Sequence, residues 1–393
     1  MDFLDQALKI KDEIIKDYES LHGLAEVGFD LPRTIEYVKS RLCDMSIEHE
    51  ELGGGIVGYI GQRRDGCTLL RADMDALPIK EKTGLPFSAE GDAMHACGHD
   101  AHTAMLLGVA RILKSMENPP SVKFMFQPAE EILLGAKSMI TAGVLDAPRV
   151  GRAFMLHVIV GTSLKSGSLI VSSGGVSAPE VSFFRITVNG SACHGSTPEK
   201  GRDPISALCR IINSLDSLRA RELPQGDGSM ISIGKLSAGT SANVIPGEAV
   251  AEGSLRAFSA KGAEHIRERL RAFVSGICTA HEVKGTVDFY SGAPALLNDR
   301  ELSSRACNLL KSEICGATVT TSEELSREMN GNGKGGGSED FAYISQKVPS
   351  LMIGLAAGRQ EDGYIHPLHH ESMRIDTGAL SYGSSALATL ASL

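Results

Sequence analysis

Apolar and polar positions alternate along the first part of the chain in a rhythm that predicts helices and strands in turn. Helical spacing of apolar residues marks four segments, 2–22, 31–45, 102–115 and 132–142. Compact apolar runs bounded by polar or glycine residues predict four strands, GIVGYIG, CTLLRAD, SVKFMFQ and RAFMLHV. Because this alternation is typical of a sheet flanked by helices, the sequence predicts an α/β fold with a mixed, mostly parallel sheet.

The pattern changes after residue 177. Residues 178–292 contain a strand, a helix, two strands, a helix and a strand, which is the βαββαβ order of a two-layer, ferredoxin-like unit. The remaining residues return to helical spacing at 299–315, then to the apolar run VPSLMIGL and a terminal helical pattern. We therefore expect one domain made of residues 1–177 and 293–393, with a small lid domain, 178–292, inserted into it.

Composition narrows the classes of partner. The chain has 393 residues with 42% hydrophobic content and a formal net charge of −9, so no general basic field exists to attract nucleic acid or anionic lipid. The N-terminal residues mix acids and lysines with apolar residues, unlike a signal peptide, and the eight cysteines form no CxxC pair. We expect a cytoplasmic protein with reduced thiols and with neither nucleic acid nor membrane as a partner.

Two glycine-rich motifs are not nucleotide sites. Gly53, Gly55 and Gly58 satisfy GxGxxG, but they lead into a predicted strand instead of a helix. The run GNGKGGGS lacks the GK[ST] ending of a phosphate-binding loop, so we expect only a turn ahead of Ser338.

Residues able to bind metal ions recur where predicted strands end. Asp73 and Asp75 follow one strand, Glu130 and Glu131 follow the next, and His157 ends a third. In open α/β sheets, ligands gather at the carboxyl ends of the strands. This recurrence predicts one shared site.

The segment HACGHDAH adds more candidate ligands just before an amphipathic helix. Gly98 separates Cys97 from His99, so in an extended segment both side chains point the same way and form a chelating pair. Structural roles account for the other two polar residues equally well: Asp100 as a helix N-cap, and His102 as a hydrogen-bonded turn histidine.

The adjacent glutamates suit hydrolysis. In an extended chain Glu130 and Glu131 point in opposite directions, so one can hold a metal while the other accepts a proton from the attacking water. Near the C-terminus, His366, His369 and His370 lie close to acidic residues that could orient their imidazole rings.

Seven segments, in order across nearly the whole chain, resemble the metallo-aminoacylase and carboxypeptidase family: RADMDALPI, HACGHDAHTA, QPAEE, LHV, NVIPGEAVAEGSLRAF, GSEDF and LHHESMRID. The sequence is most similar to its amidohydrolase branch, which contains hippurate hydrolases, N-acyl-amino-acid deacylases and plant indole-acetyl-amino-acid amidohydrolases. The resemblance implies a zinc-peptidase-like catalytic domain, an inserted lid that also serves dimerisation, and a homodimer or higher homo-oligomer.

The resemblance also implies the site. Glu130 is expected to be the general base, and two divalent ions per subunit are expected to be held by Cys97, His99, Glu131, His157 and His369. Cys97 takes the place of the bridging aspartate of more distant relatives. One departure from the family pattern is Glu371, which stands where a proline usually follows the histidine pair.

In the lid, the resemblance assigns three further residues. His194 matches a histidine that stabilises the developing oxyanion. In relatives that dimerise through their lids, this histidine enters the active site of the partner subunit. Asn243 and Arg256 match positions that bind carboxylate or carbonyl groups of the substrate.

The expected activity is hydrolysis of the amide bond of an N-acyl amino acid or related small conjugate. A thiolate ligand favours Zn²⁺, while imidazole and carboxylate ligands also bind Mn²⁺, Co²⁺ or Ni²⁺. We therefore expect Mn²⁺ or Zn²⁺ as the metal cofactor, with Co²⁺ or Ni²⁺ also possible. Three alternatives stay open: a metal-dependent dipeptidase or carboxypeptidase, a cysteine hydrolase with Cys97 as nucleophile and His99 as base, and a non-catalytic metal-binding protein.

Overall fold

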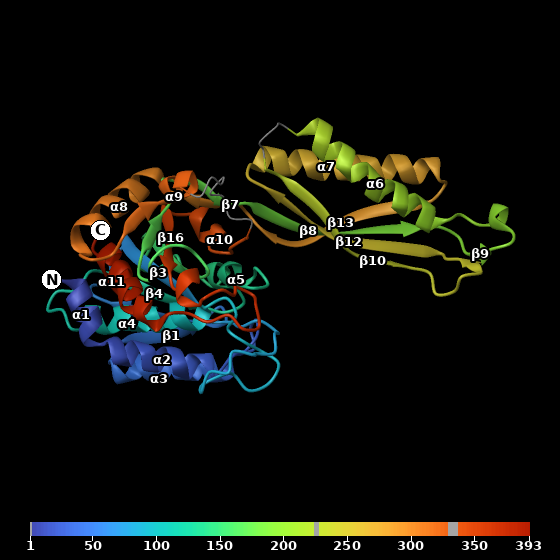
Figure 1. Cartoon of the computed structure of the whole chain (residues 1–393). Helices are drawn as coiled ribbons and strands as arrows, with labels where there is room; N and C mark the ends of the chain where they lie inside the picture. Colours follow the sequence, from blue (N-terminus) through green and yellow to red (C-terminus); the bar gives the residue numbers. More distant parts are fainter. Residues whose placement is uncertain (1, 224–227, 329–336) are drawn as a thin grey trace. The chain divides into compact units, whose positions relative to one another are not determined.

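The structure is a computed structural model that describes residues 2–223, 228–328 and 337–393. Residue contacts divide the chain into two compact units (Figure 1). Unit 1 contains the chain up to Ser177, a segment that starts at Leu297, and Glu339–Leu393, while unit 2 contains Ala178–Leu296 and Ser338. The boundary at the C-terminal end of unit 2 therefore lies between Leu296 and Leu297, whereas the sequence placed it after residue 292. That unit 1 is a catalytic domain and unit 2 a lid stays a prediction. The turn expected from GNGKGGGS lies outside the described residues.

Unit 1 is built on an eight-stranded sheet. Its strands, in spatial order, are β1 (Glu48–Leu52), β2 (Gly55–Ile60), β4 (Val122–Gln127), β3 (Cys67–Asp73), β5 (Val150–Ile159), β16 (Ser350–Ala356), β6 (Leu169–Val171) and β15 (Val319–Thr321). The central pairs β4–β3, β3–β5 and β5–β16 are parallel, as is β6–β15. The other neighbours, β1–β2, β2–β4 and β16–β6, are antiparallel. The predicted mixed, mostly parallel sheet is confirmed.

The helices of unit 1 are α1 (Phe3–Lys9), α2 (Lys11–His22), α3 (Pro32–Asp44), α4 (His99–Lys114), α5 (Gly135–Thr141), α8 (Arg300–Glu313), α9 (Ser322–Glu328), α10 (Ala342–Ser345) and α11 (Leu380–Ala391). The single helix predicted at 2–22 is two helices, because Ile10 leaves the helical conformation with φ −105° and ψ 21°. Helix α4 begins at His99 instead of residue 102, which places His99 and Asp100 in its first turn.

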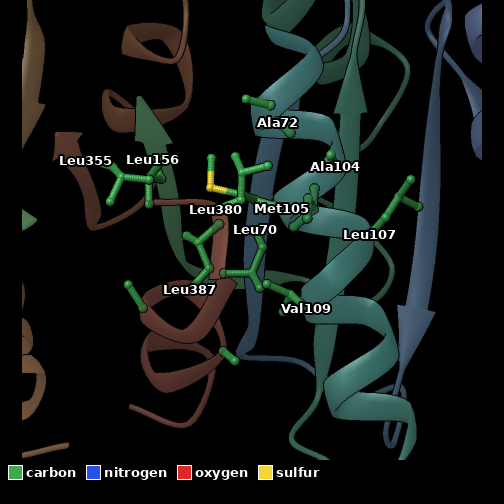
Figure 2. Packing of buried hydrophobic residues seen from close by; sticks show 14 of the residues in the cluster. Leu70, Ala72, Ala104, Met105, Leu107, Val109, Leu156, Leu355, Leu380 and Leu387 are labelled. Atoms are coloured by element: carbon green, nitrogen blue, oxygen red, sulfur yellow. The ribbon is translucent and has the colours of Figure 1, made fainter. Parts of the chain in front are cut away.

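The two faces of this sheet differ in chemistry. Strand β3 is buried along its whole length, and side chains alternate between the faces of a strand. Leu70 and Ala72 belong to the main hydrophobic core, where they pack with residues of α4 and α11 (Figure 2). The alternate residues of β3, Arg71 and Asp73, are also buried but point to the opposite face. One face therefore holds the core, while the other carries buried charge.

Lys123 on β4 is one of these buried charges, with a relative exposure of 1%. Its Nζ donates hydrogen bonds to three backbone carbonyl oxygens at 2.8, 2.7 and 3.0 Å, those of Val144, Asp146 and Pro148. The ammonium group thus ties the turn before β5 to the middle of the sheet.

We expect Lys123→Met to lower the free energy of unfolding by roughly 1–3 kcal/mol, because three buried carbonyls lose their donor. Urea unfolding would measure it. The control is Lys114→Met, since the Lys114 Nζ donates to a single carbonyl, that of Ser46, at the surface. Equal losses in the two variants would contradict the role given to Lys123.

Unit 2 has the predicted βαββαβ order, which is confirmed: β8 (Glu180–Asn189), α6 (Pro204–Glu222), β10 (Met230–Ala238), β12 (Glu248–Ala257), α7 (Ala260–Ala280) and β13 (Lys284–Ala293). Its antiparallel sheet runs β10-β12-β8-β13. Alternate residues of β8, such as Phe184 and Ile186, pack against α6 and α7, which lie side by side on one face (Figure 1). Between these elements, β9 (Cys193–His194) pairs with β11 (Val244–Ile245).

A separate two-stranded sheet joins β7 (Gly175–Ala178) and β14 (Leu296–Asn298). Within the described ranges, no helix has both the length and the apolar character required to cross a bilayer.

Candidate metal centre

The predicted site lies where three neighbouring strands end. Strands β4, β3 and β5 are parallel neighbours in the sheet, so their carboxyl ends meet at one edge. Asp73 ends β3, the turn with Glu130 and Glu131 follows β4, and His157 lies near the end of β5. The structure thus brings these strand ends together at one edge of the sheet, and their role as one shared metal site stays a prediction.

The five candidate ligands converge. Cys97 Sγ lies 3.6 Å from His157 Nε2, and Glu131 Oε1 lies 3.9 Å from His99 Nε2 and 3.7 Å from His369 Nε2. Their ligand atoms fall within 4.8 Å of one another in overlapping groups: Cys97, His99 and His157; Cys97, Glu131 and His369; and His99, Glu130 and Glu131.

The Cys97–His99 pair is not held by an extended segment, so that prediction is wrong. Gly98 between them has a left-handed backbone, with φ 83°, and α4 begins directly after it. A Cβ at Gly98 would lie 2.4 Å from Val158 Cγ2, so only glycine fits this turn. The two side chains still face one centre, but a tight turn brings them there instead of the alternation of a strand.

The two glutamates do not point in opposite directions either. The preceding Ala129 has φ 55°, which ends the extended backbone, and both carboxylates approach His99 Nε2, each with an oxygen at 3.9 Å. The backbone N–H groups of Glu130 and Glu131 donate to the Asp75 carboxylate at 2.9 and 3.2 Å. Asp75 therefore fixes the turn that presents both glutamates.

Asp75 also orients a candidate ligand. Nδ1 of His99 donates to the Asp75 backbone oxygen at 2.8 Å, which leaves Nε2 facing the centre. The sequence placed Asp75 among the candidate ligands but gave it no specific role. In the structure it acts on the backbone and on the imidazole beside it.

His369 reaches the centre from the C-terminal part of the chain. It has φ 67°, and its backbone N–H donates to the Ala96 oxygen at 2.7 Å. Glu371, the departure from the family pattern, is tied to Lys82 by a 2.9 Å ion pair and by its backbone oxygen, which accepts the Lys82 N–H at 2.7 Å. This pair of contacts anchors the segment where a proline is usual.

His102 has the structural role that the sequence left open, although it lies in α4 instead of a turn. Its Nδ1 donates to Asp73 at 2.6 Å and its Nε2 accepts the Val158 N–H at 2.9 Å. Burial lowers the pKa of His102 to about 4 despite the Asp73 carboxylate. With both ring nitrogens engaged, His102 supports β5 instead of facing the centre.

Asp100 is not the helix N-cap, because Gly98 holds that position. Its carboxylate accepts a 2.6 Å hydrogen bond from His22 Nδ1, and His22 Nε2 lies 3.1 Å from Glu81. Burial alone would lower the pKa of His22, but the two carboxylates raise it to about 10. His366 stacks on His370, with ring centroids 4.2 Å apart, and belongs to none of the ligand groups.

Arg71 is the main residue of the site that sequence reasoning missed. It is fully buried, and its guanidinium contacts the carboxylates of Asp73, Glu339 and Asp340 at 2.6, 2.9 and 2.9 Å. Its Nε also donates to the Gln127 side chain at 2.9 Å. An arginine inside an apolar strand ordinarily signals a solvated position, so the sequence offered no sign of this network.

Electrostatics show whether the residues present suit divalent cations. Burial raises the pKa of the Cys97 thiol to about 12 and that of Glu131 to about 7. Burial and the nearby Glu339 and Asp340 carboxylates also raise the pKa of Glu130 well above its usual value. The buried atoms His99 Nε2 and Glu131 Oε1 have no hydrogen-bond partner in the part of the chain that the structure describes. Divalent cations would supply both the missing positive charge and the missing contacts, so the donor set fits them.

The three lid residues lie in unit 2. His194 is exposed on β9, beside Asn243, whose backbone oxygen accepts the Gly195 N–H at 2.8 Å. Arg256 lies at the other end of β12 from Glu248, roughly 25 Å along the strand. Its guanidinium donates to Ser338 Oγ at 2.9 Å. Because β9 lies beyond the Glu248 end (Figure 1), His194 and Arg256 of one chain cannot contact the same small molecule.

Comparison with known proteins agrees with this geometry. A family model described as Peptidase family M20/M25/M40 matches residues 69–392. The chain belongs to this family. Membership in family M20/M25/M40 confirms the family predicted from the sequence motifs and the predicted class of enzyme, a hydrolase of amide bonds.

Individual relatives in this family match over nearly the whole chain. An N-acetylcysteine deacetylase of Bacillus subtilis is 32% identical, covering 96% of this chain and 96% of its own. Thermostable carboxypeptidase 1 of Saccharolobus solfataricus is 34% identical, covering 98% of this chain and 95% of its own. The crystal structure of a Bacillus subtilis dinuclear metal-binding peptidase from the M20 family matches with a TM-score of 0.80 and 30% identity, covering 98% of both chains. The predicted fold class is confirmed.

Proposed function

We propose that this chain is a binuclear metal-dependent amidohydrolase that cleaves the amide bond of N-acyl amino acids or related small conjugates. One observation carries the proposal: a thiol, three imidazoles and a carboxylate converge beside a second carboxylate, that of Glu130. The ligand residues proposed are Cys97, His99, Glu131, His157 and His369. The deacetylase relative supports the class of substrate, and the dinuclear peptidase supports two metal ions.

Glu130 suits the role of general base. It is only 6% exposed, its position is fixed by Asp75, and burial raises its pKa. A carboxyl group shifted in this direction exchanges protons more readily near neutral pH than an ordinary glutamate. Glu130 accepts a proton from the water that attacks the carbonyl carbon, and then passes it to the amine nitrogen as the C–N bond breaks.

Two divalent cations, when bound, would polarise the amide carbonyl and lower the pKa of the attacking water. We propose Mn²⁺ or Zn²⁺, with Co²⁺ or Ni²⁺ also admitted. The thiol of Cys97 supports Zn²⁺, and the carboxylate of Glu131 with the three imidazoles supports the harder ions.

We propose a homodimer or higher homo-oligomer in which His194 acts across the interface to stabilise the oxyanion, while Asn243 and Arg256 bind the substrate. The distance along β12 supports this arrangement, because His194 and Arg256 of one chain lie at opposite ends of unit 2. We also propose a cytoplasmic location, which the eight free thiols support.

The carboxypeptidase relative favours a second candidate, cleavage of a C-terminal amino acid from a short peptide by the same groups.

The alternative of a cysteine hydrolase, with Cys97 as the nucleophile, is disfavoured. Burial raises the pKa of the Cys97 thiol to about 12, and a nucleophile needs the thiolate.

A substrate panel tests the proposal. We expect N-acetyl, benzoyl or indole-acetyl amino acids to be hydrolysed faster than dipeptides, activity to be lost with a chelator, and Mn²⁺ or Zn²⁺ to restore it. Preference for peptides would favour the carboxypeptidase, and full activity in chelator would overturn a metal-dependent mechanism. Native mass measurement would give the subunit number.

A further inference from the structure

Unit 1 contains a cavity of about 390 Å³ between α2 and two loops. The first loop contributes Leu85 and Phe87, and the second runs from Asp362 to Thr377. None of the proposed metal ligands lines this cavity. Its volume falls in the range of cavities that bind small molecules.

One wall of the cavity is aromatic and firmly packed. Tyr18 is only 3% exposed, and its ring meets Phe87 edge-on with centroids 5.8 Å apart. Phe87 in turn packs edge-on against His22 at 5.4 Å. The Tyr18 hydroxyl has no hydrogen-bond partner among the described residues. The Tyr18 oxygen is not one of the buried side-chain atoms that lack a partner, so it is open to solvent and can bond to a ligand or water.

The cavity is also lined by side chains of opposite charge. Arg374 supplies a cation, and Glu19 and Asp362 supply carboxylates. In the described part of the chain, none of the three side chains forms an ion pair or a hydrogen bond. Burial and the carboxylates of Asp376 and Asp362 raise the pKa of Tyr364, while Arg374 opposes them, so these charges lie around one ring.

We propose that this cavity binds a free α-amino acid with an apolar side chain. Its carboxylate would pair with Arg374, its ammonium group with Asp362 or Glu19, and its side chain would pack on Phe87 and Leu85. A phosphate or a dicarboxylate fits less well, because the two acidic side chains would repel it.

The position of the cavity connects it with the metal centre. Tyr364 and Arg374, which line the cavity, flank His369 in the sequence. A ligand held between them restrains the segment that carries this imidazole. A free amino acid is also the product of the proposed function, so a role in product recognition rests on that function, whereas binding itself does not.

Titration of the metal-loaded protein with L-leucine, followed by calorimetry and tyrosine fluorescence, tests the proposal. The chain has no tryptophan and seven tyrosines, two of which line the cavity, so fluorescence reports on this site. We expect saturable binding that weakens at least tenfold in Arg374→Met, since a charge-assisted hydrogen bond is lost. The matched control, Arg64→Met, removes an exposed arginine outside the cavity lining and should not change the affinity.

Two analogues test the assignment of charges. L-Leucinamide lacks the carboxylate and 4-methylpentanoate lacks the ammonium group, and we expect both to bind more weakly than L-leucine. Absence of saturable binding, or equal affinity in Arg374→Met, would overturn the proposal while leaving hydrolysis intact. Leucine binding that depends on Arg374, in a protein that hydrolyses no N-acyl amino acid, would instead overturn the proposed function and keep the cavity site.

Discussion

Glu130→Gln should lower kcat by about 10²–10⁴-fold while both metal ions stay bound, because the amide cannot accept the proton of the attacking water. Glutamine preserves the size of the side chain, and Asp75 holds the backbone of residue 130 through its N–H group, so the turn should persist. Steady-state kinetics on an N-acyl amino acid, combined with metal analysis of the purified variant, would measure the two effects separately.

Glu131→Gln is the informative comparison. Its carboxylate lies within 3.9 Å of both His99 and His369, so we expect loss of metal as well as loss of activity. If Glu130→Gln turned over at the wild-type rate with a full complement of metal, Glu130 would not be the base. If it lost metal as Glu131→Gln does, it would be a ligand instead.

The sequence indicated several of the residues that the structure brings together, because they lie at or just after the ends of apolar strands. Asp73, Glu130, Glu131 and His157 each follow or end an apolar run, and parallel neighbours bring such positions together. The order of elements in unit 2 was also visible, because each strand and helix there shows its own periodicity. These features are local, so a single sequence contains them.

The rest depends on contacts between distant parts of the chain. Asp340 receives hydrogen bonds from Arg71 and Gln127, which are 269 and 213 residues away. Asp75 binds a backbone N–H 55 residues further on. No periodicity reports such pairs. The left-handed turn at Gly98 was missed for a related reason, since it is imposed by Val158 from a separate strand.

The contacts among Arg71, Glu339 and Asp340 act both on the sheet and on the proposed base. Arg71 lies on the charged face of β3, and the carboxylates of Glu339 and Asp340 approach both it and Glu130. Arg71 opposes the burial that raises the pKa of Asp340 to about 7, while the Glu339 and Asp340 carboxylates raise the pKa of Glu130. The network thus supports the sheet edge and adjusts the proposed base together.

Arg71→Met is expected to lower the free energy of unfolding by about 3–5 kcal/mol, because the buried carboxylates of Asp73 and Asp340 lose an arginine partner. Urea unfolding of the metal-free protein would measure this loss. Arg152→Met is the matched control, since Arg152 on the neighbouring strand donates to the Thr68 hydroxyl at 3.1 Å and pairs with no carboxylate of the described residues. A loss of only about 1 kcal/mol is expected there. If Arg71→Met is too unstable to purify, Arg71→Lys can replace it, because lysine keeps the charge but lacks the planar guanidinium. Its loss of unfolding free energy should lie between those expected for Arg71→Met and Arg152→Met.

The stability that Arg71→Met loses relative to the wild type should depend on pH. Burial pushes the pKa of Asp73 up, but Arg71, His99 and His102 hold it well below its ordinary value of 3.8. A carboxyl group with a lowered folded-state pKa contributes stability above its unfolded pKa, and the contribution is lost as the pH falls through the folded-state pKa. Burial raises the pKa of Asp340 to about 7 although Arg71 opposes this, so Asp340 is protonated before Asp73 as the pH falls. The difference in stability between the wild type and Arg71→Met should therefore begin to shrink below about pH 7 and shrink further below pH 3.8. A difference that stayed constant over this range, or that matched Arg152→Met at every pH, would mean that packing of the Arg71 stem, and not its charge, stabilises the site.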